Sequence, residues 1–531
     1  MSEIVSATDA GRTGTAGTTV QRLRRNAVGL PGVLFMAVAT AAPIAAMVAN
    51  VPIAIGFGNG ANAPAGYMVA TIVLGLFALG YSAMAKHITA TGAFYGFISH
   101  GLGRVLGMSA GALTTMAYIV FEASLVGLFA YFGHNFALNH LGLNVPWILL
   151  ALAMLAVNAV LTYFDVTLTA KVLGVFLITE IGMLLLMASG ILFSGGGPQG
   201  WSLQSLNPVN AFRDLNQVVA DPISAGAVAV ATGTAGIGLF FAFWSWVGFE
   251  STAMYGEESR NPKKMIPIAI MVAVLGIGVF YVFISWIAIV GTGPDNAVSL
   301  AQNASAAGEI FFGPAREHLG QWSVYLFEFL LMTGSFACGM AFHNCASRYL
   351  YAIGRENLVP GFGATLGATH PKHGSPHIAS VVQTGMATAI VLWFFLTDRD
   401  PYTSLFALMG LLGTSAILIV QSLAAFAAVA YFHVHHKHPE SANWFRTLIA
   451  PLLGGFGMLY VTYLLFTNSS FLAGAGATDI VFTLNPWVVA AVGLGGLLFA
   501  LGCKYLAPDR YESIGRIVLE DTRERDETPS A

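Results

Sequence analysis

Apolar residues gather into twelve runs along the chain, separated by shorter polar segments. A helix of roughly 20 mostly apolar residues spans the hydrocarbon core of a bilayer. The pattern therefore predicts an all-α, polytopic membrane protein with twelve transmembrane helices. The runs lie near residues 30–55, 65–86, 105–135, 145–163, 170–194, 233–256, 266–291, 320–350, 377–397, 402–433, 446–467 and 485–507.

The composition of the 531-residue chain agrees with a membrane protein. Hydrophobic residues make up 56% of the chain and charged residues only 9%, whereas charged residues make up about a quarter of soluble domains. This excludes a soluble globular protein. The net charge of -3, without an acidic or basic block, argues against nucleic acid as a partner.

Basic residues are distributed unevenly between the two faces of the predicted layout. Of the 23 Lys and Arg, all but Arg213, Arg316 and Arg399 fall on the side of the N-terminus. By the positive-inside rule this side is cytoplasmic. Residues 1–20 also lack the apolar core of a signal peptide. We therefore expect a multi-pass protein of the cell (cytoplasmic) membrane with both termini in the cytoplasm.

Two long connections on the opposite face, 195–232 and 292–319, are rich in Gly, Pro, Asn and Ser. Such clusters are typical of turns and loops. We expect short helices and loops that cover the outer face.

The sixth run contains both a glycine, Gly248, and an ionisable residue, Glu250. A carboxylate at membrane depth is costly unless it faces the protein interior. A glycine beside it lets the helix unwind where backbone groups line a cavity. We interpret this stretch as half of a substrate site, with Trp244 covering a cationic group of the ligand. The predicted substrate contacts are Phe243, Trp244, Ser245 and Gly248.

The first run is interrupted as well, because Pro43 stands among small residues in its middle. Proline removes a helical hydrogen bond and clashes with the preceding turn. Interruptions in spans one and six, five spans apart, are the pattern of an inverted five-helix repeat with a midplane site. The alternative is that Pro43 only kinks a packed helix. The predicted substrate contacts here are Ala42, Pro43, Ile44 and Ala45.

Four carboxylates lie within spans: Glu122, Glu180, Glu250 and Glu328. Each is either a coupling group or a hydrogen-bonded residue that holds helices together. Glu180 follows Lys171 by nine residues, about 13 Å along a helix, which places it near mid-depth. In the eighth span Glu328, Ser335 and His343 fall on one stripe. The predicted proton-coupling or gating residues are Glu250, Glu180, Glu122 and Ser335.

We predict no metal, no cofactor and no catalytic centre. The cysteines Cys338, Cys345 and Cys503 lack metal-ligand spacing and are interpreted as packing residues. The histidines His433, His435, His436 and His438 have no Cys or carboxylate pair to complete a site, so we interpret them as a solvated helix end. The charged run from Glu257 to Lys264 is interpreted as a cytoplasmic loop, with a gating salt bridge as the less favoured reading.

Three motifs give the chain a family resemblance. They are Phe243–Ser251 with its continuation Glu257–Pro267, then Gly92–Phe97, and Ser347–Pro360. They resemble the amino acid, polyamine and organocation (APC) transporter superfamily, in the amino acid permease type, over about residues 25–505. The resemblance implies alternating access and a 5+5 inverted repeat with discontinuous helices 1 and 6, plus two C-terminal helices.

The implied domain layout has cytoplasmic tails at 1–25 and 509–531 around a transporter domain at 26–508. Repeat one covers about 26–195, repeat two about 230–436, and the extra helices about 445–508. The substrate's amino and carboxyl groups would lie between the two breaks. Glu250 matches a glutamate proposed in relatives to link protonation to gating, and Glu180 aligns with a position where some proton-coupled relatives carry a lysine.

One departure from the family pattern affects the substrate. Relatives often carry Gly-Ser-Gly at the first break, where this chain has Pro43-Ile44-Ala45, so recognition of an α-carboxylate is altered. We expect a secondary transporter of amino acids or related amines, coupled to protons. The alternatives are a polyamine or ethanolamine-type transporter, an exchanger, and a ligand sensor without transport; the oligomeric state stays open.

Overall fold

A computed structural model describes residues 29–164, 166–220, 228–256, 258–303, 308–467 and 479–515. Within these ranges, nine helices are long and apolar enough to cross a membrane, and a shorter apolar helix covers Trp147–Tyr163. The chain is therefore a multi-pass helical membrane protein. The nine are Leu30–Ala85, Arg104–Leu141, Gly174–Phe193, Pro262–Thr292, Gln321–Arg355, His377–Leu396, Pro401–Val434, Trp444–Thr467 and Ile480–Leu506.

Three of the twelve predicted runs are not counted separately among these nine. Leu30–Ala85 contains the first two runs, while the fourth run is α7 (Trp147–Phe164). The sixth run consists of two short pieces, α9 (Ala235–Trp244) and η6 (Phe249–Tyr255). The twelve-helix count and the inverted repeat stay predictions, as do the cytoplasmic tails, since residues 1–28 and 516–531 lie outside the described ranges.

The first run is divided into several short helices before the second begins. These are α1 (Leu30–Ala41), α2 (Pro43–Ala45), the π-helical turn η1 (Ala46–Asn50), α3 (Val51–Ile53), the π-helical turn η2 (Ala54–Asn59) and the 3-10 turn η3 (Gly60–Asn62). The second run is the continuous helix α4 (Ala63–Ala85).

The other helices range from long continuous helices to short turns. They are α5 (Ala93–Gly101), α6 (Arg104–Leu141), α8 (Val166–Phe193), α10 (Pro262–Thr292), α13 (Gln321–Arg355), α14 (His377–Leu396), η7 (Pro401–Phe406) with α15 (Ala407–Val429) and η8 (Ala430–Val434), η9 (Pro439–Ser441), η10 (Trp444–Ile449) with α16 (Ala450–Thr467), α17 (Ile480–Leu506) and α18 (Pro508–Ser513).

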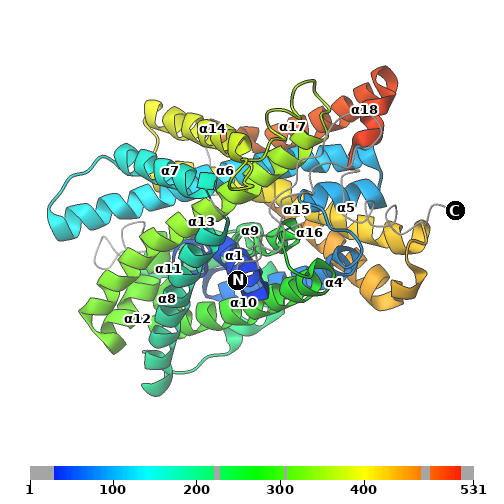
Figure 1. The fold of residues 1–531 in the computed structure, drawn as a ribbon. Coiled ribbons are helices and arrows are strands. Elements are labelled where there is room, and N and C mark those ends of the chain that lie inside the picture. The colour runs from blue at the N-terminus through cyan, green and yellow to red at the C-terminus, as the bar shows by residue number, and fades with distance from the viewer. Residues whose placement is uncertain are drawn as a thin grey trace, which may run out of the picture.

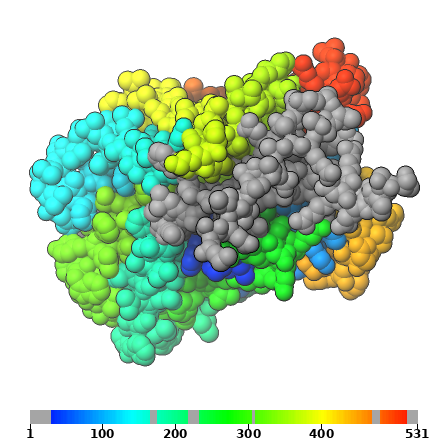
Figure 2. All heavy atoms as spheres, in the orientation of Figure 1, coloured from blue at the N-terminus to red at the C-terminus, as the bar shows by residue number. Residues whose placement is uncertain are grey.

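The interrupted spans occupy the middle of the helix array. In Figure 1, α1 and α9 lie centrally, with α7 and α14 to one side and α16 to the other. Every residue of α9 is buried, whereas α17 exposes apolar side chains such as Trp487 and Leu498. Figure 2 shows the blue atoms of the first span between those of α8 and α10. Exposed apolar residues on outer helices are suited to contact lipid, while the central pair is shielded from it.

The long outer connections contain more than the helices and loops expected of them. Residues Leu215–Ala220 (β1) and Val228–Gly233 (β2) pair as an antiparallel hairpin, preceded by η4 (Gln204–Leu206) and η5 (Pro208–Phe212). The second connection forms α11 (Pro294–Gln302) and α12 (Glu309–Leu319). The expectation of helices and loops alone was therefore wrong for the first connection, whose valine-rich runs favour strands.

Candidate functional site

The first interruption lies at Ala42, between α1 and α2. Ala42 has φ 45° and ψ 74°, a left-handed conformation that costs a non-glycine residue roughly 1–2 kcal/mol. Pro43 follows and has no N–H to donate. The neighbouring carbonyls accept from side chains instead: the Cys338 thiol donates to the Thr40 carbonyl (3.1 Å), and the Tyr281 hydroxyl donates to the Ala41 carbonyl (2.8 Å).

The second interruption lies between α9 and η6, at Gly248. This residue has φ 124°, which an L side chain rarely adopts. A Cβ added at Gly248 would lie 2.7 Å from the Thr40 Cβ, so the two interrupted spans meet here with no room for a side chain. Both interruptions predicted from the sequence are confirmed in position, and they are in contact.

A buried glutamate meets the start of the second half of each interrupted span. The Ile44 N–H donates to Glu180 across 3.5 Å, a long hydrogen bond. The Gly248 N–H donates to Glu250 (3.0 Å), whose other carboxyl oxygen accepts from the Tyr118 hydroxyl (3.0 Å). Helix N-termini favour negative charge, so each carboxylate occupies a position suited to an anion.

A small pocket opens beside the two interruptions. Its free volume of about 20 Å³ holds little more than one water molecule. Most of its lining residues have apolar side chains, and a few carry polar groups. The lining residues are Thr40, Ala41, Ala42, Ala45, Ala46, Asn50, Leu125, Trp244, Ser245, Val247, Cys338, Phe342 and Phe406.

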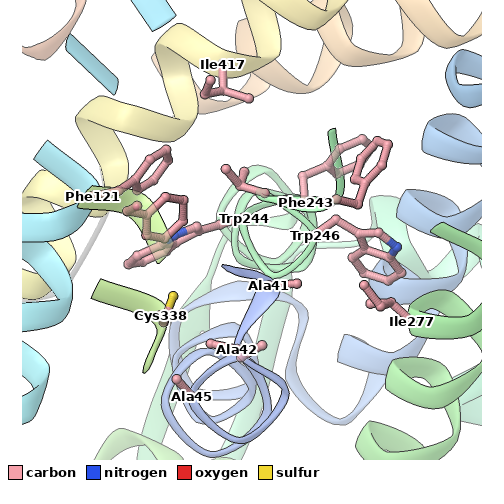
Figure 3. Packing of buried hydrophobic residues seen from close by; sticks show 14 of the residues in the cluster. Ala41, Ala42, Ala45, Phe121, Phe243, Trp244, Trp246, Ile277, Cys338 and Ile417 are labelled. Atoms are coloured by element: carbon pink, nitrogen blue, oxygen red, sulfur yellow. The ribbon is translucent and has the colours of Figure 1, made fainter. Parts of the chain in front are cut away.

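The two tryptophans of the sixth run have different surroundings. In Figure 3, Trp244 points toward Phe121 and Cys338, while Trp246 points the other way, toward Ile277. The Trp244 ring packs on Phe406 with centroids 4.8 Å apart, and an ideal Cβ at Gly410 would lie 2.0 Å from it. Trp244 therefore lines the pocket, and its role as a lid stays a prediction.

Ser245 links three segments at the edge of the pocket. Its hydroxyl lies 3.1 Å from both the Asn50 amide nitrogen and the Tyr67 hydroxyl, and it donates to the Phe241 carbonyl (2.8 Å). The first, second and sixth spans are thereby joined through one oxygen atom. A polar atom of a substrate at this point would compete with these bonds.

Comparison with known proteins assigns the family. The family model described as "Amino acid permease" matches residues 28–495. The chain belongs to the amino acid permease family. It is also 24% identical over 430 residues to the branched-chain amino acid permease BcaP of Bacillus subtilis (strain 168), an alignment that covers 75% of this chain and 79% of that relative.

The protein is thus an APC-superfamily permease, a transporter and not an enzyme, with a small-molecule amino acid substrate. Of the substrate contacts predicted for this permease, Ala42, Ala45, Trp244 and Ser245 line the pocket. Pro43, Ile44, Phe243 and Gly248 are buried nearby and shape the interruptions. They are not among the lining residues, and their roles in binding stay predictions.

Glu122 and Ser335 are not brought to the pocket. Both Glu122 oxygens lie 3.0 Å from the His343 Nδ1, and one also accepts from the Gln383 amide (2.7 Å). Ser335 donates to the Leu331 carbonyl of its own helix (2.6 Å). Glu328 instead contacts His140, near the start of α13. Glu328, Ser335 and His343, which were predicted to share one stripe, therefore contact different partners. The coupling roles of Glu122 and Ser335 stay predictions.

The interpretation of the Glu257–Lys264 run as a charged cytoplasmic loop was wrong for Glu258, which is buried. The less favoured salt bridge is present there, although the sequence analysis did not identify Arg348 as the partner. Two Arg348 contacts of 3.0 Å reach the Glu258 carboxylate, and the guanidinium lies 4.7 Å from the centre of the Tyr255 ring. Arg348 is fully buried. The sequence did contain an indication of this pair. Arg348 lies within the motif after the eighth span, and a buried arginine requires a partner of opposite charge.

Proposed function

We propose that the permease carries small neutral amino acids with aliphatic side chains across the cytoplasmic membrane by alternating access, coupled to protons. The pocket at the meeting point of the two interruptions carries this proposal. Leu125, Val247 and Phe342 in its wall suit an aliphatic side chain, and each methylene they bury contributes about 0.8 kcal/mol. The relative named a branched-chain amino acid permease agrees with this substrate class.

The polar ends of a bound amino acid would meet the half-helices. Their N-terminal N–H groups favour the carboxylate, and carbonyl ends favour the ammonium group. Thr40, Asn50 and Ser245 offer further hydrogen bonds at the pocket wall. In this arrangement the substrate bridges spans one and six, so its binding favours one relative position of the two spans.

Glu180 and Glu250 are the proposed proton acceptors. Each carboxylate accepts an N–H from the start of a half-helix. A proton on either group removes its negative charge, and the charge-assisted hydrogen bond is weakened. Proton binding would thereby loosen the contact between the half-helix and its neighbour, which couples protonation to movement.

The Glu258–Arg348 pair is proposed as the cytoplasmic gate. It joins the segment after η6 to α13, on the side that the positive-inside rule assigns to the cytoplasm. Arg399 pairs with Asp479, and both belong to connections assigned to the outer face. Each pair joins segments that the predicted layout places on the same face. The proposal that the termini are cytoplasmic rests on the positive-inside rule.

An amine without a carboxylate is the second candidate substrate. The observation that favours it is the Glu180 contact, since the Ile44 N–H already donates to a carboxylate. A charged Glu180 would repel a substrate carboxylate and attract an ammonium group.

Uptake into proteoliposomes tests both candidates. The purified permease is reconstituted, and uptake of radiolabelled leucine, isoleucine and valine is measured with and without an inside-alkaline pH gradient. We expect saturable accumulation that depends on the gradient and is inhibited by the other aliphatic amino acids. Competition by putrescine or ethanolamine alone would favour the amine. Accumulation that ignores the pH gradient would contradict proton coupling, and no saturable uptake of any of these compounds would contradict the transport proposal.

A further inference from the structure

Three potential metal ligands meet where α4 and η8 end. His87 follows α4, whereas His438 and Glu440 lie after η8, about 350 positions further along the chain. One ligand atom from each residue can be chosen so that all three lie within 4.8 Å of one another. The imidazole rings of His87 and His438 are stacked, with centroids 3.9 Å apart.

The histidine tract predicted to be a solvated helix end is divided by the fold. The His433 Nε2 lies 2.9 Å from the Thr447 hydroxyl, and the His435 Nε2 lies 2.9 Å from the Gly101 carbonyl oxygen. His438 instead has φ 53°, a left-handed conformation that costs a non-glycine residue roughly 1–2 kcal/mol. This strained backbone turns the end of the tract toward His87, so the ligand absent from the local sequence comes from another span.

We propose that His87, His438 and Glu440 bind a divalent transition metal ion. The ion is Zn²⁺ or another that prefers imidazole nitrogen and carboxylate oxygen as ligands. Two imidazole nitrogens and one carboxylate oxygen are a donor set that Zn²⁺ accepts, with a fourth position left for water. The His87 Nε2 lies 2.9 Å from the Ser441 hydroxyl, a hydrogen bond that a metal ion bound at this nitrogen would replace.

A bound ion requires these side chains to rearrange. Ligand atoms of a tetrahedral zinc site lie roughly 3.3 Å apart, from bond lengths near 2.0–2.1 Å. The His438 Nδ1 already lies 3.0 Å from the exposed Glu440 carboxylate, so the main movement needed is a rotation of the stacked His87 and His438 rings.

The surroundings limit the affinity of this site. Lys86 and Lys263 lie close enough to act on His87, and both oppose a bound cation, while Glu440 favours it. We therefore expect the carboxylate to be required. A bound ion would tie the end of α4 to the segment after η8. If spans two and ten move apart during transport, which rests on the proposed function, the ion would slow uptake.

Metal binding is tested on the purified full-length permease in detergent, with an affinity tag that contains no histidine. Zn²⁺ binding is measured by calorimetry, and Co²⁺ absorption in the visible range reports the ligand geometry. We expect one ion per chain. His87→Gln, His438→Gln and Glu440→Gln should each weaken binding by about tenfold or more, since loss of residues that only support ligands already costs 10–100-fold.

Two histidine variants serve as matched controls. His436→Gln changes the same tract, and His373→Gln changes a separate cluster in which the His373 ring lies 4.6 Å from that of His370. Both should bind Zn²⁺ as the wild type does. The proposal is overturned if no ion binds, or if His373→Gln loses the ion while His438→Gln keeps it. Glu440 is exposed, so its variant gives a result even if His87→Gln does not fold.

Transport gives an independent readout. We expect Zn²⁺ to slow uptake severalfold in the wild type and to leave His438→Gln unaffected. Zn²⁺ binding without any measurable uptake of amino acids or amines would contradict the proposed function and leave the metal site standing.

Discussion

The two interruptions at the centre of this permease are built differently. At Gly248 neighbouring residues of the same segment complete the interruption. The glycine adopts φ 124°, and the Glu250 carboxylate, two residues later, accepts its N–H. At Ala42 a non-glycine residue adopts the left-handed conformation. The polar groups around it are satisfied by Glu180, Tyr281 and Cys338 from three other spans.

This difference suggests a division of roles. The second interruption is largely encoded by local sequence and depends on the absence of a side chain at one position. The first is held by partners on α8, α10 and α13, so its shape depends on where those helices lie. In the proposed transport cycle the first interruption therefore responds to helix movement, and the second provides a fixed contact.

The largest effect is expected from Gly248→Ala. The added Cβ would lie 2.7 Å from the Thr40 side chain and 2.8 Å from its backbone, and the backbone conformation would be strained as well. Substrate uptake should fall by about 100-fold or more, because contact distortions of roughly 1 Å can cost that much. Initial rates in proteoliposomes measure this, normalised to the reconstituted protein. Uptake within a factor of three of the wild type would contradict the fixed-contact role.

The next effect separates the two glutamates. Glu250 accepts from two donors, but the Gln amide offers one acceptor oxygen. In Glu250→Gln the Gly248 N–H keeps that oxygen, the Tyr118 hydroxyl accepts from the amide NH₂, and the Tyr118 hydrogen loses its acceptor. An unsatisfied buried group costs about 1–3 kcal/mol, and uptake should fall by roughly 5- to 150-fold and lose its dependence on the pH gradient.

Glu180→Gln is the matched variant. Among the described residues, the Ile44 N–H is the donor to Glu180, and the amide oxygen of the variant can still accept from this N–H. Uptake by this variant should fall by less than tenfold, estimated from the same free-energy cost of a lost hydrogen bond. A greater loss in Glu180→Gln than in Glu250→Gln would reverse the proposed order of importance.

A smaller effect is expected from removing one hydroxyl at each interruption. Tyr281→Phe leaves the Ala41 carbonyl without its side-chain donor, whereas Tyr118→Phe leaves Glu250 with the Gly248 N–H. The first change should lower stability by about 1–3 kcal/mol and the second by about 1 kcal/mol. Thermal unfolding in detergent compares them. Equal losses would indicate that both interruptions depend on remote partners to the same degree.

The smallest effect is expected from Ala42→Gly. Glycine adopts the left-handed conformation without steric cost, and the gain is offset by the greater freedom of the unfolded chain. Stability should remain within about 1 kcal/mol of the wild type, with uptake unchanged. If uptake were lost, the strain at Ala42 would itself be part of the mechanism.

The sequence by itself determined the membrane class, the approximate positions of the spans and the two interruptions. These depend on local properties: the length of apolar runs, a proline among small residues, and a glycine beside a carboxylate. It also identified Trp244 and Ser245, because polar and aromatic residues beside an interruption are exposed to the same cavity.

Only the tertiary structure decided which distant side chains complete each site. Glu122 meets His343 and Gln383, Arg348 meets Glu258, and the Cys338 thiol, interpreted as mere packing, contacts the first interruption. These partners are separated by 90 to 298 positions in the chain. No local sequence pattern predicts these partners. The packing of whole helices determines which helix faces meet, and the spacing of residues within one helix does not determine that packing.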